Sequence, residues 1–153
     1  MSFTLNPDIS RDLVVGLQSI TVEFTNGSAC SLLPDPIWTF IDSSIPYIYL
    51  PIEACKLFET TFGLVWNSTY ETYFVPENVH QSLLEANSNV TFQIANSKAG
   101  GGSVEISLPY SSFDLVMNYP LVPTNISGAR YFPLMRASND SQYTLGRIFL
   151  QEA

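Results

Sequence analysis

Short stretches in which apolar and polar residues alternate recur along this chain, and turn residues separate them. Ile20–Phe24 alternates in this way and leads into Thr25–Ser28, whose Asn-Gly dipeptide is typical of a tight hairpin turn. Val90–Ile94 and Ser103–Leu108 form a second alternating pair, joined by a glycine-rich loop. Because successive side chains of a strand point to opposite faces, this pattern predicts a mostly β fold with one face of the sheet buried.

Helix signals are fewer. The clearest lies between Pro51, which is tolerated where a helix begins, and Gly63, which suits a left-handed cap. Apolar side chains at three- and four-residue spacing predict one buried face, made of Ala54, Cys55, Phe58 and Phe62. Residues 76–85 are a shorter helix candidate, and the other strand candidates cover residues 29–33, 38–41, 45–50, 70–75, 131–136 and 143–150. No repeat or linker divides the sequence, so we expect a single domain over residues 1–153, with 1–11 as an N-terminal extension or linker.

Composition excludes several classes of function. With 46% hydrophobic and 13% charged residues, the chain has the profile of a globular protein. It carries 6 basic against 14 acidic residues, so it lacks the basic stripe that a nucleic-acid partner needs. No apolar stretch is long enough to span a bilayer. His80 is the only histidine and is expected on a polar helix face, Gly100–Gly102 lacks the Lys-Ser or Lys-Thr of a phosphate loop, and we predict neither a metal nor a cofactor.

Five Asn-X-Ser/Thr glycosylation sequons point to the secretory pathway. They begin at Asn26, Asn67, Asn89, Asn125 and Asn139, whereas about two would be expected by chance. The chain opens without the features of a signal peptide, so we expect a piece of a longer secreted or cell-surface protein. In that compartment Cys30 and Cys55 would form one disulfide around the intervening segment, and the alternative is two separate buried thiols.

Asp42 lies in the segment of the sequence that is the best candidate for a catalytic site. It separates the apolar run that ends at Ile41 from the run that begins at Ile45, and Ser43 and Ser44 follow it directly. An aspartate in this setting is placed at a tight turn, where backbone amides can donate hydrogen bonds to its carboxylate. The alternative is an ordinary turn or capping aspartate without a chemical role.

This segment resembles the catalytic loop of pepsin-like aspartic peptidases, in which Asp-Thr-Gly or Asp-Ser-Gly is followed by a strand, a proline and a helix, as Tyr47–Phe62 is here. Tyr143–Leu150 resembles the Ile-Leu-Gly-Asp-X-Phe-Leu signature that passes beneath the loop in that family. The resemblance runs in the order of the family from about Asp12 to Ala153, and it looks closest to fungal members. It implies a mostly β fold with one or two short helices, formed as a single lobe of the bilobal pepsin-like acid protease β-barrel fold. The residue roles that it implies are Asp42 as a catalytic aspartate, Ser43 and Ser44 as its loop, and Leu145 and Gly146 as the support below.

Three departures from the family pattern bear on activity. Ser44 replaces the loop glycine, Ile45 replaces a residue whose hydroxyl supports the aspartate, and Arg147 replaces a common aspartate. The family also needs an N-terminal lobe with its own aspartate, since two carboxylates share one proton and activate a water. The resemblance therefore implies the C-terminal lobe of a secreted aspartic endopeptidase or peptidase-like protein, inactive alone, which acts on extended polypeptides with the N-terminal lobe of the same parent protein or with a second copy. The alternatives are a non-catalytic pepsin-fold module for binding or for the cell surface, and a homodimeric peptidase of the retroviral type.

Overall fold

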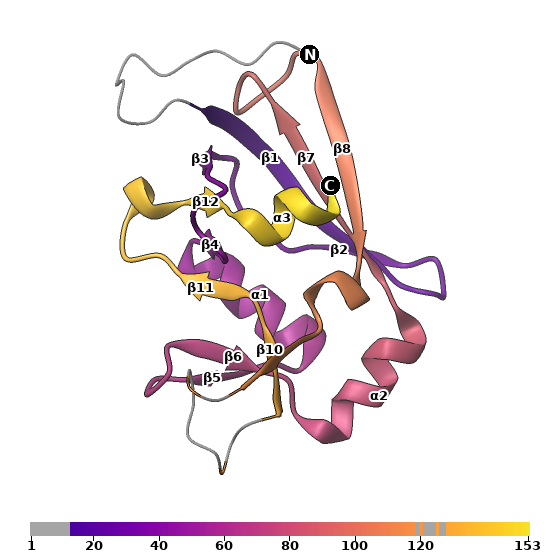
Figure 1. Cartoon of the computed structure of the whole chain (residues 1–153). Helices are drawn as coiled ribbons and strands as arrows, with labels where there is room; N and C mark the ends of the chain where they lie inside the picture. The colour runs from indigo at the N-terminus through magenta and orange to yellow at the C-terminus, as the bar shows by residue number, and fades with distance from the viewer. Residues whose placement is uncertain (1–12, 119, 121–124, 126–127) are drawn as a thin grey trace.

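Figure 1 presents the computed structural model, which describes residues 13–118, 120, 125 and 128–153. The expected extension over residues 1–11 lies outside the described residues. Eight strands form the larger sheet: β1 (Val14–Glu23), β2 (Ala29–Ser31), β3 (Ile37–Ile41), β4 (Ile48–Leu50), β7 (Asn89–Ala95), β8 (Ser103–Pro109), β11 (Leu134–Arg136) and β12 (Thr144–Leu145). Their order is β11-β4-β12-β3-β1-β7-β8, with β2 paired to β1. The predicted mostly β class is confirmed, and within the described residues this sheet is an open path rather than a closed barrel.

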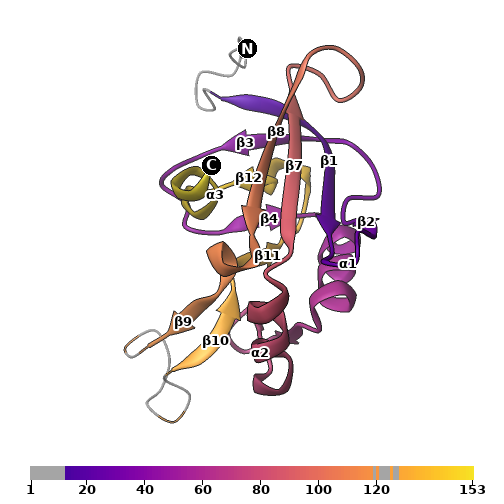
Figure 2. The same ribbon diagram turned by 90° about the vertical axis from the view of Figure 1, so that its right-hand side faces the viewer.

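A second, smaller sheet of four strands lies beside the first. Its strands are β5 (Val65–Asn67), β6 (Thr72–Phe74), β10 (Ala129–Phe132) and β9 (Leu115–Met117), in that order. The helices are α1 (Ile52–Phe62), α2 (Glu77–Ala86) and α3 (Arg147–Glu152), with two short 3₁₀ turns, η1 (Tyr110–Phe113) and η2 (Asp140–Gln142). Figure 2 shows the long strands β1, β7 and β8 running upright while β3, β12 and β4 run across them, so the larger sheet is strongly bent. None of the described helices is long and apolar enough to cross a membrane.

Helix α1 confirms the sequence prediction. Pro51 is its N-cap, and Gly63 caps its end with a left-handed φ of 66°. The buried residues of α1 are the four that the spacing predicts, Ala54, Cys55, Phe58 and Phe62. The local pattern therefore fixes both the ends of this helix and the face that it buries.

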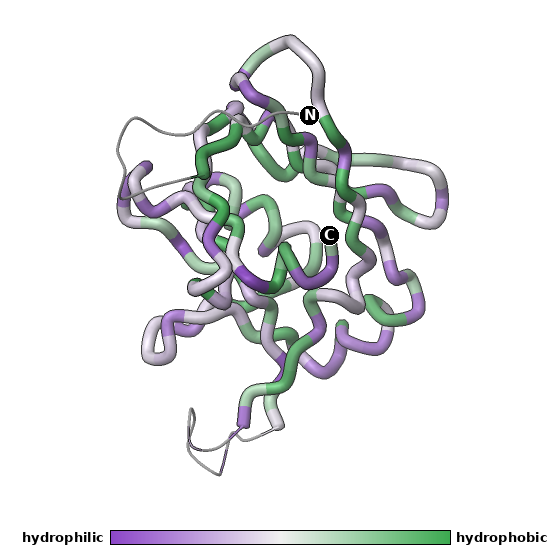
Figure 3. The backbone as a smooth tube through the Cα atoms, turned by 45° about the horizontal axis from the view of Figure 1, so that its top comes forward, coloured by the Kyte–Doolittle hydropathy of each residue, from purple (hydrophilic) through white to green (hydrophobic). Residues whose placement is uncertain are grey.

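The core lies between the bent sheet and the elements that cover it. Ile20 and Val22 of β1 pack with Phe92 of β7, and the Phe92 ring meets that of Phe149 from α3 edge to face at 5.2 Å. In Figure 3 many outer turns are hydrophilic, and hydrophobic segments follow the strands and helices inside them. A second aromatic group around Phe132 joins the smaller sheet to α1.

Residues 143–150 do not form the single strand that their apolar character suggests. Only Thr144 and Leu145 are in a strand, and Gly146 is the N-cap of α3. Ile148 and Phe149 are adjacent in α3, and both are buried. In a strand, adjacent side chains would point to opposite faces of the sheet. A short apolar run fits a buried strand and a buried helical turn equally well, so periodicity alone could not separate them.

The predicted disulfide between Cys30 and Cys55 is wrong in this structure, where both cysteines are free. The Cys30 sulfur lies 3.9 Å from the Thr61 hydroxyl, near the end of α1. Cys55 lies six residues earlier on that helix, a rise of about 9 Å, whereas a disulfide needs Cβ atoms about 4 Å apart. The Cys55 thiol instead donates to the carbonyl oxygens of Leu50 and Met135, each at 3.6 Å.

We therefore expect two titratable thiols in this chain when it is unfolded without a reductant. In the native state Cys55 should resist Ellman's reagent, because burial raises the pKa of its thiol to about 12 and the thiolate is the reactive form. Cys30 is only partly buried and should react first. If the unfolded, unreduced chain had no reactive thiol, the two cysteines would be joined in a disulfide after all.

Candidate functional site

Strand β12 lies between β3 and β4 and fixes the loop that joins them. It runs parallel to β3, with Leu145 beside Ile41, and antiparallel to β4, with Leu145 beside Ile48. The Asp42 amide at the start of the loop donates to the Leu145 carbonyl oxygen at 3.2 Å. The structure thus brings the Asp42 loop into direct contact with the Leu-Gly segment, which lies about a hundred residues later in the chain.

Gly146 makes this crossing possible. A Cβ atom at this position would lie 2.1 Å from the carbonyl oxygen of Tyr47 and 2.4 Å from that of Ile45. The next amide, that of Arg147, donates to the same Ile45 carbonyl at 2.6 Å. The Asp42 loop is therefore held at its start by Leu145 and near its end by Arg147, with a glycine packed between them.

The Asp42 carboxylate is organised by Ser44. Its Oδ1 atom accepts hydrogen bonds from the Ser44 amide at 2.8 Å and from the Ser44 hydroxyl at 2.6 Å. These two bonds, the hydroxyl first, hold the pKa of the Asp42 carboxyl below its usual range, because they stabilise the ionised form. Ser44 has a negative φ, so a side chain in place of the family's glycine causes no backbone strain here. Ser44 thus supplies a hydroxyl donor to Asp42.

Replacement of Ser44 by alanine is expected to raise the pKa of Asp42, because it removes the donor with the larger effect. A carboxyl with a lowered native pKa stabilises the fold above its unfolded value of about 3.9 and loses that contribution as the pH falls through the native value. The site is near the surface, so this effect on stability is small. Titration of the Asp42 carboxyl carbon by NMR measures the change, and Ser43→Ala is the control that should leave it unaltered. An equal shift in both variants would contradict the assignment.

Asp42 has no second acid beside it within the described residues. The groups that shift the pKa of Asp42 are the two Ser44 donors and burial, and no other charged residue contributes. No cluster of three or more histidine, cysteine or acidic residues that could hold a metal occurs in the described part of the chain. A proton-sharing pair of carboxylates would require the second one from another lobe or chain.

A pocket of about 270 Å³ borders the Asp42 loop. The residues that line it are Ile45, Tyr49, Thr144 and the η2 residues Ser141 and Gln142. Apolar and hydrogen-bonding groups thus meet beside the end of the Asp42 loop, a combination that is common in ligand pockets.

His80 belongs to a buried polar cluster that sequence reasoning missed. It was expected on a polar helix face, but it is only 7% exposed and its Nε2 atom lies 2.9 Å from Oδ1 of Asp114. The Asp114 carboxylate also accepts from Arg130 at 3.3 Å and from the Tyr110 hydroxyl at 3.4 Å. His80 lies in α2, Asp114 directly follows η1 and Arg130 lies in β10, so the three charged members are far apart in sequence and no local pattern could have brought them together. The cluster ties these three elements together.

The five sequon asparagines lie on described residues. Asn26, Asn89, Asn125 and Asn139 are exposed, and Asn67 is partly buried. The side chains of Asn26 and Asn139 each accept hydrogen bonds from the serine two residues later, in exposed turns. Glycosylation of these positions stays a prediction.

Comparison with known proteins supports the fold. No protein-family model matches the sequence, and no curated protein is similar to it in sequence. Among solved structures, the chain is similar to an aspartic proteinase from Irpex lacteus, with 15% sequence identity and a TM-score of 0.58. The match covers 89% of this chain and 37% of the proteinase chain. The chain therefore has a pepsin-like fold and spans little more than a third of that proteinase.

Proposed function

We propose that this chain is the C-terminal lobe of a secreted pepsin-like aspartic endopeptidase or of a peptidase-like relative, with Asp42 as one of its two catalytic aspartates. The single observation that carries the proposal is the contact of the Asp42 amide with the Leu145 carbonyl, with Gly146 packed under the same loop. This is the relationship between loop and supporting segment that the sequence resemblance implies. The sequons support a secretory or cell-surface location.

In the assembled enzyme Asp42 and the aspartate of the other lobe would share one proton and hold a water between them. The ionised carboxylate removes a proton from this water, whose oxygen attacks the peptide carbonyl, and the protonated carboxyl supplies a proton to the carbonyl oxygen. Ser44 occupies Oδ1 of Asp42 with two hydrogen bonds, which leaves Oδ2 to face the water. The pocket beside Ile45 and Tyr49 would receive part of an extended polypeptide.

The test compares this chain alone with the parent protein that contains the second lobe. Alone, the chain should not cleave denatured haemoglobin at about pH 3 to 5, because the dyad is incomplete. The parent should cleave it in a pepstatin-sensitive reaction that Asp42→Asn abolishes and that the same replacement at the exposed Asp35, Asp35→Asn, retains. Pepstatin-sensitive cleavage by the isolated chain, or full activity of the Asp42→Asn parent, would contradict the proposal.

A second candidate is a non-catalytic binding module with the same fold. It is favoured by Ile45, which cannot donate a hydrogen bond to Asp42, and by Ser44, which adds bulk where the family has glycine. A parent protein that lacks an upstream Asp-Thr-Gly motif and shows no cleavage would support this function over the peptidase.

A further inference from the structure

Helix α2 is anchored by a titratable side chain. Of its 10 residues, all of which the structure describes, only His80 is buried. The apolar side chains Val79, Leu83 and Leu84 pack against the core but are only partly buried. In α1, by contrast, four residues are buried and none of them is charged. A surface helix usually docks through an apolar stripe, so the docking of α2 depends on His80 to an unusual degree.

His80 reaches a carboxylate that several groups share. We call His80, Asp114, Arg130 and Tyr110 the His80 cluster. Nε2 of His80 lies 2.9 Å from Oδ1 of Asp114 and 3.1 Å from Oδ2. The Tyr110 hydroxyl donates to Oδ1 at 3.4 Å, and the Arg130 guanidinium donates to Oδ2 at 3.3 Å. Among the described residues, these three side chains are the charged or titratable groups in contact with Asp114, and an ionised carboxylate can accept from all of them.

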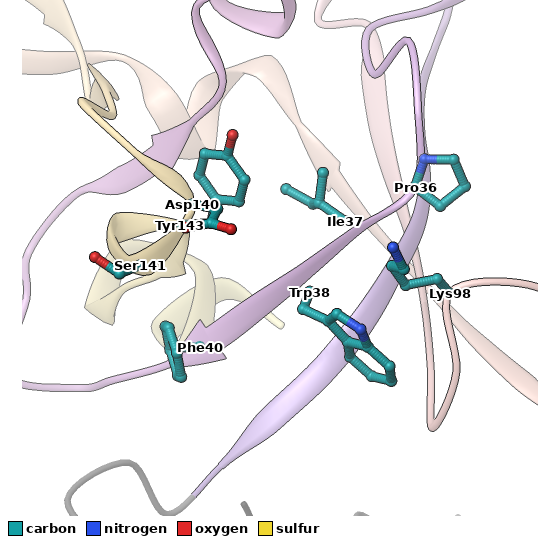
Figure 4. Close-up of a pocket in the computed structure, with 8 residues that line it drawn as sticks. All are labelled: Pro36, Ile37, Trp38, Phe40, Lys98, Asp140, Ser141 and Tyr143. Carbon is teal, nitrogen blue, oxygen red and sulfur yellow. The ribbon is translucent and has the colours of Figure 1, made fainter. Parts of the chain in front are cut away.

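The charges beside β3 have a different environment. A pocket of about 390 Å³ lies where β3, the η2 turn and the loop between β7 and β8 meet, and Trp38, Lys98 and Asp140 are among the residues that line it (Figure 4). All three are exposed, so water and salt screen the two charges and a proton on Asp140 would change the fold little. The Asp114 side chain is only 8% exposed, and loss of one partner from a buried ion pair leaves the other charge uncompensated.

A proton on Asp114 would therefore act mainly on His80. In acid an imidazole is cationic and a carboxyl group is neutral, so His80 would lose its counter-charge. Arg130 is 36% exposed and can be solvated where it is, whereas His80 is 7% exposed and reaches water only if α2 moves. Tyr110 stays a neutral donor, because burial, and then the charge of Asp114, raises the pKa of its hydroxyl.

The two ends of α2 are held by different kinds of bond. His80 lies in the first turn of the helix, and the His80 cluster attaches this end. Beyond the last turn, the Ser111 amide donates to Oδ1 of Asn87 at 2.9 Å, and the Tyr110 amide donates to the Ser88 carbonyl at 3.0 Å. Neither of these bonds involves a titratable group, so the C-terminal end can stay attached when the first turn leaves.

We infer that the His80 cluster is an acid-sensitive switch, which holds α2 in place while Asp114 is ionised and releases its first turn when Asp114 takes up a proton. The release exposes Val79, Leu83 and Leu84 to water, while α1 and the larger sheet stay folded on their apolar anchors. Local opening of this kind is expected of an element with few buried apolar side chains. The inference does not involve Asp42 and does not depend on the proposed peptidase function.

Hydrogen exchange of the full chain tests the switch. The protection factor of an amide is its intrinsic exchange rate divided by the measured rate, so it can be compared between pH values. In the wild type, the protection factors of α2 should fall about tenfold or more between about pH 7 and about pH 2, because the carboxylate becomes protonated in this range. Those of α1 should change less than about threefold over the same range.

Three variants assign the effect to the His80 cluster. Asp114→Asn has the shape of the protonated carboxyl and cannot ionise, so at about pH 7 its α2 should be as weakly protected as that of the wild type in acid. His80→Leu replaces the titratable anchor by an apolar one and should keep α2 protected in acid. Glu77→Gln removes an exposed carboxylate from the same turn of α2 and should keep the wild-type profile.

The protection of α1 reports whether each variant is folded. If Asp114→Asn does not fold, the profiles of the wild type and of His80→Leu still decide. The inference is overturned if α2 of the wild type stays protected in acid, or if α1 and α2 lose protection together. It is also overturned if His80→Leu loses the protection of α2 in acid as the wild type does.

Discussion

Replacement of Gly146 by alanine is expected to destabilise the fold by about 3 kcal/mol or more, or to prevent folding. The added Cβ would lie 2.1 Å from the Tyr47 carbonyl oxygen and 2.4 Å from that of Ile45. Both are backbone atoms, so no side chain can rotate away to make room. Gly146 has a φ of −85°, which alanine adopts freely, and the expected loss is therefore entirely steric.

Urea denaturation measures this effect, and Gly102→Ala is the matched control. A Cβ at Gly102 meets no atom within 4 Å, and we expect its free energy of unfolding to stay within about 0.5 kcal/mol of the wild type. If the two variants unfold at the same denaturant concentration, β12 does not cross beneath the Asp42 loop as described, and the basis of the proposed peptidase function is lost with it.

Replacement of Phe132 by alanine should lower the free energy of unfolding by about 3 to 5 kcal/mol. Phe132 is 1% exposed on β10, and its ring lies 5.7 and 5.5 Å from those of Phe58 and Phe62 on α1. It also stacks on Phe113 of η1 with ring centroids 4.9 Å apart. One side chain therefore joins the smaller sheet, the helix and the 3₁₀ turn, and its removal leaves a cavity between them.

Two further substitutions calibrate this result. Phe132→Leu keeps part of the volume and should cost clearly less than the alanine variant, because the cavity is smaller. Val65→Ala removes apolar atoms at a mostly exposed position of the same sheet and should change stability by no more than about 0.5 kcal/mol. Similar losses for Phe132→Ala and Val65→Ala would show that Phe132 does not lie at the centre of the aromatic group.

Local sequence patterns predicted a large part of the fold. Helix α1 begins and ends where proline and glycine indicate, and the hairpin of β1 and β2 turns at Asn26 and Gly27, where Gly27 has a φ of 82°. The alternating runs 90–94 and 103–108 pair as the antiparallel strands β7 and β8. These features depend on neighbours within a few residues, and side-chain periodicity and turn chemistry report such neighbours directly.

Where a short element has no strong period, the sequence prediction failed. Residues 147–150 were expected to continue a strand, and the structure has α3 there. His80 was expected on a polar face, but its partner Asp114 lies 34 residues away and holds it in the interior. The predicted disulfide was wrong because the two cysteines lie at different positions along α1. Cys30 lies beside Thr61 near the end of the helix, whereas Cys55 is six residues earlier within it, and sequence spacing does not report this distance.

The sequence by itself determined the mostly β character, the ends and buried face of α1, and the position of Asp42 between two apolar runs. Only the tertiary structure decided that β12 inserts between β3 and β4, that Ser44 supplies both hydrogen bonds to Asp42, and that Trp38, Lys98 and Asp140 line one pocket. The physical reason is range: periodicity and turn preferences act over a few residues. The contacts that build the candidate site join segments about a hundred residues apart, and packing of the whole chain selects them.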